Sequence, residues 1–278
     1  MHLDIVKAHG TGNDFVVVED LDEAVELDEA TVAALCDRRR GVGADGVIRV
    51  APGRTAPVFM DHRNADGSHP EMCGNGIRVL AKYCFDRGIL NGSTAVVETR
   101  AGARTVVAHR DAAGHVCQVG VDMGPPAVGD LAAVLDAGGR TVTASLVGIG
   151  NPHAVMFVDD VAAAPVHEVG PLVETHDAFP DGVNVEFATV DSPGAISMRV
   201  WERGVGETAS CGTGACAVAV VAAETGRASR RVDVSLPGGT LHIDYGDTVT
   251  LTGPAVEVFS ARVDLNSLGI AEDAVEVG

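Results

Sequence analysis

Short apolar runs, rich in valine and threonine, recur along most of the chain. Turn-forming glycine, proline, asparagine and aspartate lie between them, a pattern typical of β-strands. The predicted strands span residues 15–18, 46–50, 105–110, 117–123, 154–158, 196–201, 231–236, 241–245 and 248–253. Because few helical patterns separate these runs, we expect a largely antiparallel or mixed sheet.

Two other segments have the apolar spacing of a helix, and each follows the pattern Cys-Gly-x-Gly. Apolar residues recur at intervals of three and four after Cys73 and again after Cys211. Gly88 and Gly226 stand where helix C-terminal stops are expected. No charged residue lies between Cys211 and Glu224, so the second helix should be buried nearly all round. A third helical pattern covers residues 28–40.

The two Cys-Gly-x-Gly motifs belong to a longer internal match. Cys73 and Cys211 are 138 residues apart, and the "GTGN" ending at Asn13 matches the "GIGN" ending at Asn151 at the same separation. Further matches join Met60 with Met198, and the "DGV" of 45–47 with that of 181–183. Their common order indicates a duplication. We therefore predict two α/β units, residues 1–116 and 117–262, each with a central helix wrapped by strands.

Composition narrows the classes of function. The chain has 278 residues, 46% of them hydrophobic, which is enough for a sizeable core in one or two domains. A formal charge of −19 disfavours nucleic acid and anionic membranes as partners. The longest apolar run, 215–223, is far shorter than a membrane span. Six cysteines and no signal-like segment fit a reducing cytoplasm.

A cysteine at a helix N-terminus has chemical consequences. The unpaired N–H groups and the helix dipole stabilise a thiolate, which makes the thiol a usable base or nucleophile. The same N–H groups, left accessible by glycine, form a site for a carboxylate. Most cysteines are instead small buried apolar residues. That description suits four of the six, which lie on apolar faces or in strand-like runs: Cys36, Cys84, Cys117 and Cys216.

Cys73 and Cys211 together allow three interpretations. A metal site has little support, because the chain has no C-x-x-C and no paired histidine spacing. Two facing thiols could form a redox pair. Two facing acid/base groups could instead remove a proton from one face of a tetrahedral carbon and deliver one to the other. The duplication favours this third interpretation, which is racemisation or epimerisation.

Six ordered motifs between about residues 6 and 251 closely resemble the diaminopimelate epimerase family. They are "HGTGNDF", "RNADGS", "MCGNGIR", "GNPHAV", "DGVNVEF" and "WERGVGETASCGTGAC". The resemblance implies a cofactor-independent isomerase that interconverts LL- and meso-diaminopimelate for lysine and peptidoglycan precursors. The implied fold is two pseudo-symmetric α/β domains, each a curled sheet around a central helix, with the active site in the cleft between them. The tail, residues 263–278, is expected to pack on the first domain.

The resemblance also implies roles for individual residues. Cys73 and Cys211 are the catalytic pair, one a thiolate and the other a thiol. The backbone of Gly74, Asn75, Gly212 and Thr213 cradles the reacting carboxylate. Glu202 serves the amino group, and His153 tunes or relays protons near the bases. Arg203 pairs with the distal carboxylate. Four asparagines complete the substrate pocket: Asn13, Asn64, Asn151 and Asn184.

Several alternatives stay open at this level. Asn13 and His153 could be structural, and Glu202 with Arg203 could form an ordinary surface ion pair. Gly46 departs from the family, in which many members have Gln, so a side-chain contact is absent there. A proline racemase or hydroxyproline epimerase shares the two-base logic but has no use for a distal carboxylate clamp. A thiol-disulfide switch is the rival from another class. A homodimer is common in the family.

Overall fold

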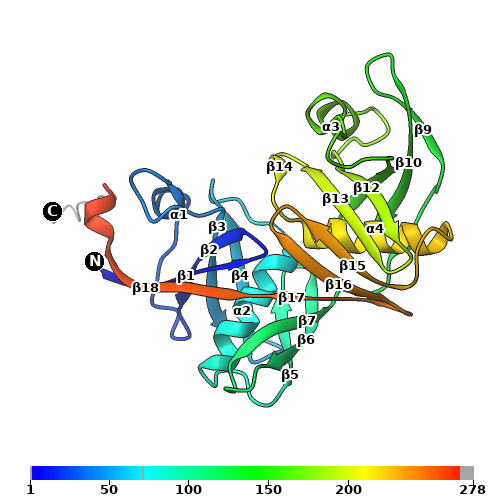
Figure 1. Ribbon diagram of the computed structural model, residues 1–278. Coiled ribbons are helices and arrows are strands. Elements are labelled where there is room, and N and C mark those ends of the chain that lie inside the picture. Colours follow the sequence, from blue (N-terminus) through cyan, green and yellow to red (C-terminus); the bar gives the residue numbers. More distant parts are fainter. Residues whose placement is uncertain (1, 71, 270–278) are drawn as a thin grey trace. The chain divides into compact units, whose positions relative to one another are not determined.

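The computed structural model describes residues 2–70 and 72–269, and its chain contacts divide them into two compact units (Figure 1). The first unit contains the described residues of 1–10, 14–117 and 255–278, and the second contains 11–13 and 118–254. The sequence predicted a boundary between the second domain and the tail at residue 262. The structure instead returns the chain to the first unit at residue 255.

The first unit is a mixed sheet with two α-helices. In chain order its elements are β1 (His2–Gly10), β2 (Asn13–Glu19), α1 (Glu29–Cys36), β3 (Gly46–Pro52), β4 (Val58–Asn64), α2 (Gly74–Asp86), β5 (Thr94–Thr99), β6 (Gly102–Arg110), β18 (Val256–Asp264) and the 3₁₀ helix η1 (Leu265–Leu268). The pairs β2–β3 and β4–β5 are parallel, whereas β3–β4, β5–β6 and β1–β18 are antiparallel. The last pair joins the two ends of the described chain.

The second unit repeats this plan with extra short strands. Its elements are β8 (Ala127–Val128), β9 (Ala133–Asp136), β10 (Thr141–Gly148), β11 (Pro152–Phe157), α3 (Val166–Glu174), β12 (Asn184–Ser192), β13 (Ala195–Glu202), β14 (Gly206–Thr208), α4 (Gly212–Glu224), β15 (Arg231–Leu236), β16 (Gly239–Tyr245) and β17 (Val249–Pro254). β7 (Val116–Asp122) leads into it and pairs with β17. Again β11–β12 and β13–β15 are parallel, and β12–β13 and β15–β16 are antiparallel.

The duplication extends to the strand register. Phe15 pairs with Gly46 between β2 and β3, and His153 pairs with Asn184 between β11 and β12, which is the same pairing 138 residues later. Val50 pairs with Met60, and Ala188 with Met198, at that same separation. The strands of the two units therefore correspond at a constant separation of 138 residues. Residues at matched positions can be compared directly between the units.

Both Cys-Gly-x-Gly motifs begin a helix that packs against the strands of its own unit, as predicted. Cys73 is the N-cap of α2, and Cys211 is the N-cap of α4. Both helices end at a left-handed glycine, Gly88 with φ 70° and Gly226 with φ 69°. The residue after each glycine donates its N–H to a carbonyl in the last turn, at 2.9 Å in α2 and 2.8 Å in α4.

The central helices are buried on nearly all sides. Residues 212–222 of α4 are all buried, as the uncharged sequence predicted. In α2 the guanidinium of Arg78 is buried as well, and it donates to the Gly74 carbonyl at 3.0 Å and to Oδ1 of Asn75 at 3.1 Å. Arg78 thereby fixes the first turn of α2 from inside the protein.

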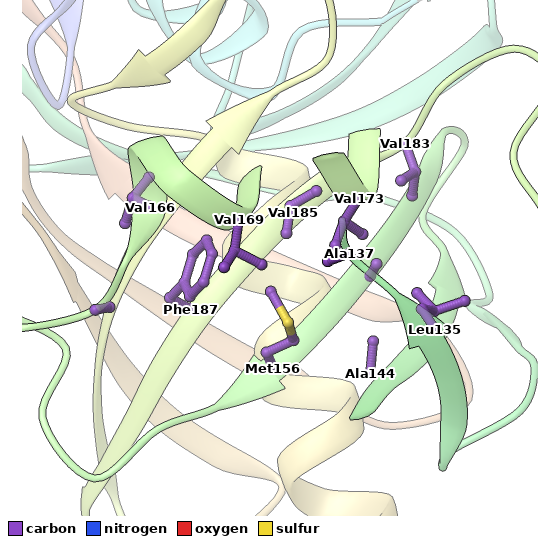
Figure 2. Packing of buried hydrophobic residues seen from close by; sticks show 12 residues of the cluster. Leu135, Ala137, Ala144, Met156, Val166, Val169, Val173, Val183, Val185 and Phe187 are labelled. Atoms are coloured by element: carbon purple, nitrogen blue, oxygen red, sulfur yellow. The ribbon is translucent and has the colours of Figure 1, made fainter. Parts of the chain in front are cut away.

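A second apolar layer in the second unit lies between α3 and the sheet (Figure 2). Val166, Val169 and Val173 of α3 face Val185 and Phe187 of β12. α3 is not among the helices predicted from the sequence, because Gly170 and Pro171 interrupt its helical pattern. Burial of its valines against the sheet outweighs that low propensity. The helix folds because of tertiary contacts.

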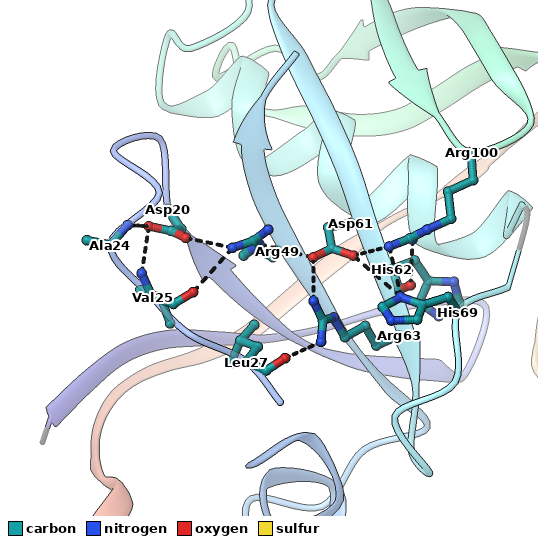
Figure 3. A network of polar contacts seen from close by, with 10 residues as sticks. All are labelled: Asp20, Ala24, Val25, Leu27, Arg49, Asp61, His62, Arg63, His69 and Arg100. Atoms are coloured by element: carbon teal, nitrogen blue, oxygen red, sulfur yellow. Dashed lines mark hydrogen bonds and ion pairs between the residues drawn. The ribbon is translucent and has the colours of Figure 1, made fainter. Parts of the chain in front are cut away.

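A buried carboxylate organises β3 and β4 in the first unit (Figure 3). Asp61 is 1% exposed and pairs with Arg49 at 3.0 Å, Arg63 at 3.1 Å and Arg100 at 2.5 Å. Burial acts to raise the pKa of Asp61, but hydrogen bonds from Arg100 and Arg63 outweigh it and lower the pKa. Arg63 of this network is followed in sequence by Asn64, the last residue of β4.

Candidate active site

Cys73 is held at the start of α2 in an extended conformation. Its thiol is partly exposed and accepts a hydrogen bond from the N–H of Gly76, with 3.3 Å between nitrogen and Sγ. Ile48 of β3 lies close to the Cys73 thiol at this helix N-terminus. A Cβ added at Gly76 would be 3.2 Å from Cδ1 of Ile48 and 3.5 Å from Sγ of Cys73. The helix N-terminus and its Gly76 N–H favour a thiolate at Cys73, and the neighbouring Ile48 adds no charge of its own.

Cys211 has the same backbone position and a different environment. It is 5% exposed, and its Sγ lies 3.5 Å from the hydroxyl of Thr213. Burial raises the pKa of the Cys211 thiol well above its ordinary value, and the nearby carboxylates of Glu202 and Glu186 raise it further. Thr213 and the Gly214 N–H act in the opposite direction. The second thiol is therefore held towards its protonated form.

Glu202 stands at the end of β13 beside this thiol. Its Oε1 accepts a hydrogen bond from the hydroxyl of Thr208. Burial raises the pKa of Glu202, and the charge of Glu186 adds to the rise, whereas hydrogen bonds with Thr208 and Cys211 oppose it. The structure thus brings Glu202 and Cys211 together, rather than using Glu202 in a surface ion pair.

Arg203 follows Glu202 and lies in the same unit as Asn184. The Arg203 N–H donates to Oδ1 of Asn184 at 3.0 Å, and its guanidinium donates to the Asp181 carbonyl at 3.1 Å. Asn184 also donates to the Pro152 carbonyl at 3.1 Å. Arg203 is exposed, while its backbone is fixed by the hydrogen bond to Asn184. This arrangement suits a cation that binds an anionic group of a ligand.

His153 is part of a buried chain of polar groups rather than an exposed residue. Its Nε2 lies 2.8 Å from Oδ1 of Asn151, and its Nδ1 lies 2.6 Å from Oε1 of Glu186. The histidine and glutamate side chains are both completely buried. Asn151 and His153 were predicted site residues, whereas Glu186 was not. A carboxylate between Val185 and Phe187, at an inward-facing position of a buried strand, was the available signal.

The remaining predicted residues divide between the units. Asn64 ends β4 and donates to the Ser68 hydroxyl at 2.9 Å, and Asn75 is buried at the first turn of α2. Asn13 begins β2, but its chain contacts group it with the second unit. Gly46 pairs with Asn64, and a Cβ there would lie 2.5 Å from the Arg63 carbonyl oxygen. The local backbone therefore excludes a glutamine at position 46.

The other four cysteines are separate from these clusters. Burial raises the pKa of Cys36 and of Cys84 to about 12, and Cys216 is buried in α4. The prediction for Cys117 was wrong, because it is exposed: along β7 the buried positions are Val116 and Val119. Within the described ranges 2–70 and 72–269, no group of three His, Cys, Asp or Glu side chains could hold a metal ion.

Comparison with known proteins identifies the family. The family model described as diaminopimelate epimerase matches residues 5–128 and 145–258. The chain belongs to the diaminopimelate epimerase family. It is 47% identical to the diaminopimelate epimerase of Moorella thermoacetica, over 94% of this chain and 99% of that protein. It is 43% identical to that of Synechococcus elongatus, over 95% and 99%.

Solved structures show that the fold is shared more widely than this family. A probable proline racemase from Agrobacterium radiobacter K84 matches 95% of this chain and 93% of that one, with a TM-score of 0.74 and 18% identity. A hydroxyproline epimerase from Agrobacterium vitis matches 99% and 96%, with a TM-score of 0.71 and 19% identity. At identities this low, the structural likeness shows the mixed α/β fold alone. The diaminopimelate epimerase relatives supply the family.

Proposed function

We propose that this member of the diaminopimelate epimerase family interconverts LL- and meso-diaminopimelate by moving the α-hydrogen between the thiols of Cys73 and Cys211. The observation that carries the proposal is that both cysteines are the N-caps of equivalent, buried helices. One thiolate removes the α-proton from one face of the carbon, and the other thiol donates a proton to the opposite face. No redox change occurs, and the cysteines exchange protonation states.

The helix N-termini supply the electrostatic help that this proton transfer needs. We propose that the N–H groups of Gly74 and Asn75, with those of Gly212 and Thr213, hold the carboxylate next to the reacting carbon. Negative charge grows on that carboxylate as the proton leaves, and fixed N–H dipoles stabilise it without reorganisation. The chain's own backbone thereby performs the part that an organic cofactor performs in other amino-acid racemases.

The rest of the substrate is assigned by charge. Glu202, partly buried beside Cys211, faces the reacting amino group, and His153 of the same unit acts on Glu202 electrostatically. Arg203 binds the distal carboxylate with help from Asn13, Asn64, Asn151 and Asn184. The exposed guanidinium and its anchored backbone support this assignment.

The direct test is incubation of reduced protein with LL-diaminopimelate in D₂O, followed by chiral separation and mass spectrometry. We expect meso product carrying deuterium at the α-carbon without any added cofactor. Cys73→Ala and Cys211→Ala should each lower the rate by at least about a hundredfold, because each removes an acid/base group. Cys117→Ala, an exposed cysteine outside the site, is the control. Near-native turnover in either catalytic variant would refute the two-thiol mechanism.

We further propose that the protein is a homodimer that uses β18. Val256, Val258 and Phe259 of this strand are 42%, 57% and 46% exposed, which is unusual for three large apolar residues within four positions. Phe259→Glu should give a monomer in sedimentation analysis, whereas Val134→Glu, at a position 69% exposed elsewhere, should not. A monomeric native protein at micromolar concentration would contradict this proposal.

We propose a cytoplasmic location, which the six free cysteines support. In the part of the chain that the structure describes, no helix is long and apolar enough to cross a membrane.

A further inference from the structure

Glu186 is a buried carboxylate near Cys211 that the proposed mechanism does not use. It lies on β12 with no exposed surface. Its Oε1 is 2.6 Å from Nδ1 of His153, while its Oε2 is buried and has no hydrogen-bond partner among the described residues. A carboxylate oxygen left without a partner inside a protein is costly, so its presence calls for a functional reason.

The duplication supplies a reference for this position. Glu186 is matched by Ile48 of β3, 138 residues earlier in the same register. A Cβ added at Gly214 would lie 2.8 Å from Oε1 of Glu186 and 3.3 Å from Sγ of Cys211. At Gly76 the corresponding neighbours are Cδ1 of Ile48 and Sγ of Cys73. The two residues therefore back their helix N-termini in the same way, one with a carboxylate and the other with a methyl group.

The residue that contacts Glu186 also has an apolar counterpart in the first unit. His153 occupies the position that Phe15 occupies in the first unit, since each pairs with the matched residue of the next strand. Nδ1 of His153 faces Glu186, and its Nε2 faces Oδ1 of Asn151. Each ring nitrogen thus has a polar partner within hydrogen-bond distance, which fixes the orientation of the ring.

The charged groups around Cys211 come from three strands. Glu186 on β12 and Glu202 on β13 act on Cys211 directly, and His153 on β11 contacts Glu186 and acts on Glu202. Two carboxylates oppose a negative charge on the buried sulfur, and burial opposes it too. At the matched position beside Cys73 stands the apolar Ile48, and the Gly76 N–H donates to the sulfur. The same strand position therefore carries a carboxylate in one unit and an aliphatic side chain in the other.

We propose that Glu186 is a positioning residue for the epimerase: it fixes the ring of His153 and keeps Cys211 protonated in the substrate-free protein, which leaves Cys73 as the thiolate. This deepens the proposed function and rests on it. The duplicated scaffold supplies two equivalent thiols, and Glu186 in place of an isoleucine makes them unequal. The enzyme is thereby prepared with one base and one acid before substrate arrives.

The test follows the ultraviolet absorbance of thiolate against pH in substrate-free, reduced protein. Each protein is compared with a derivative of itself that also carries Cys211→Ser, and the difference between the two absorbance curves is the titration of Cys211. A derivative with Cys73→Ser gives the titration of Cys73 in the same way. This readout needs no turnover and no reagent access to the buried sulfur. The parents are the native chain, Glu186→Gln, Glu186→Asp and the control Glu224→Gln, which changes a glutamate at the other end of α4.

We expect Cys73 to titrate at lower pH than Cys211 in the native chain. Glu186→Gln keeps the shape but removes the charge, so the Cys211 midpoint should fall by about one pH unit or more while that of Cys73 stays unchanged. Glu186→Asp should keep the Cys211 midpoint closer to native, and Glu224→Gln should change neither. An unchanged Cys211 midpoint in folded Glu186→Gln would overturn the proposal. Failure of the epimerase assay alone would instead refute the proposed function.

Discussion

Arg203 carries its guanidinium on an exposed side chain whose backbone is fixed by Asn184. A charge-assisted hydrogen bond to a carboxylate is worth about 1.5–3 kcal/mol. Arg203→Ala should therefore raise KM for diaminopimelate by roughly tenfold to a hundredfold, and kcat should change less. Steady-state kinetics measures this split. Arg227→Ala, an arginine stacked over Phe157 in the same unit, should leave both constants near native.

The specificity of the same residue is a stricter check. Amino acids that have no distal carboxylate should be poor substrates of the native protein. Arg203→Ala should reduce the ratio of kcat/KM for diaminopimelate to kcat/KM for such an amino acid. If discrimination between diaminopimelate and such an amino acid is unchanged in the variant, Arg203 does not bind the distal end.

His62 couples the stability of the first unit to pH. Burial and the nearby charge of Arg100 lower the pKa of His62 from 6.5 to about 4, against the opposing charge of Asp61. The unfolded chain therefore binds the proton more readily between those two values. The stabilising contribution is complete above about pH 6.5 and is lost as the pH falls towards about 4.

His62→Phe should remove this pH dependence, because phenylalanine does not titrate and its ring can keep the edge-on contact with Phe15. Urea unfolding at pH 7 and pH 4.5 should show the native chain losing about 2 kcal/mol more than the variant between the two conditions. His115→Phe, at an exposed histidine, should behave like the native chain. Equal losses in all three proteins would contradict the assignment to His62.

At the scale of an element, the glycine that ends a helix contributes to stability through its backbone conformation. Gly226 ends α4 with φ 69°, and no atom lies within 4 Å of the position of an added Cβ. Gly226→Ala should therefore destabilise the protein only through backbone strain, by about 1 kcal/mol. Gly194→Ala also has open space, but its φ lies outside the left-handed region, so it should cost nothing measurable. Thermal unfolding of the two variants, side by side, tests the difference.

The returning C-terminal segment matters at the scale of the whole chain. Leu265 is 4% exposed and packs in the first unit's core with residues of β1 and α1, more than two hundred residues away in sequence. Leu265→Ala should cost about 2–4 kcal/mol. Hydrogen exchange should locate the loss of protection in β1, α1 and β18. Leu172→Ala, at a leucine 43% exposed on α3, is the matched control, and an equal effect from it would refute the role of Leu265.

The described part of the tail agrees with that arrangement. The 3₁₀ helix η1 lies against α1, and Val263 and Leu268 pack on the same core as Leu265. Residues 270–278 of the expected tail lie outside the described residues. The boundary differs from the predicted one because β18 continues directly from β17 in sequence, and only its pairing with β1 assigns it to the first unit.

Local patterns determined much of this protein. A glycine-flanked cysteine before apolar residues at helical spacing predicted both helix starts, and Gly88 and Gly226 predicted both ends, because these signals act within one turn. The repeated motifs predicted the duplication. The six ordered motifs indicated the family that the comparisons then identified.

Tertiary structure decided what depends on distant partners. α3 forms despite Gly170 and Pro171 because a sheet covers its valines, and β18 joins the first unit because β1 pairs with it. The two cysteine motifs look alike in sequence. Their surroundings differ because Ile48 and Glu186, on strands remote in sequence, back the two helix N-termini. The sequence determined the two thiols, and the fold gave them different neighbours, which matters because burial and neighbouring charge set protonation.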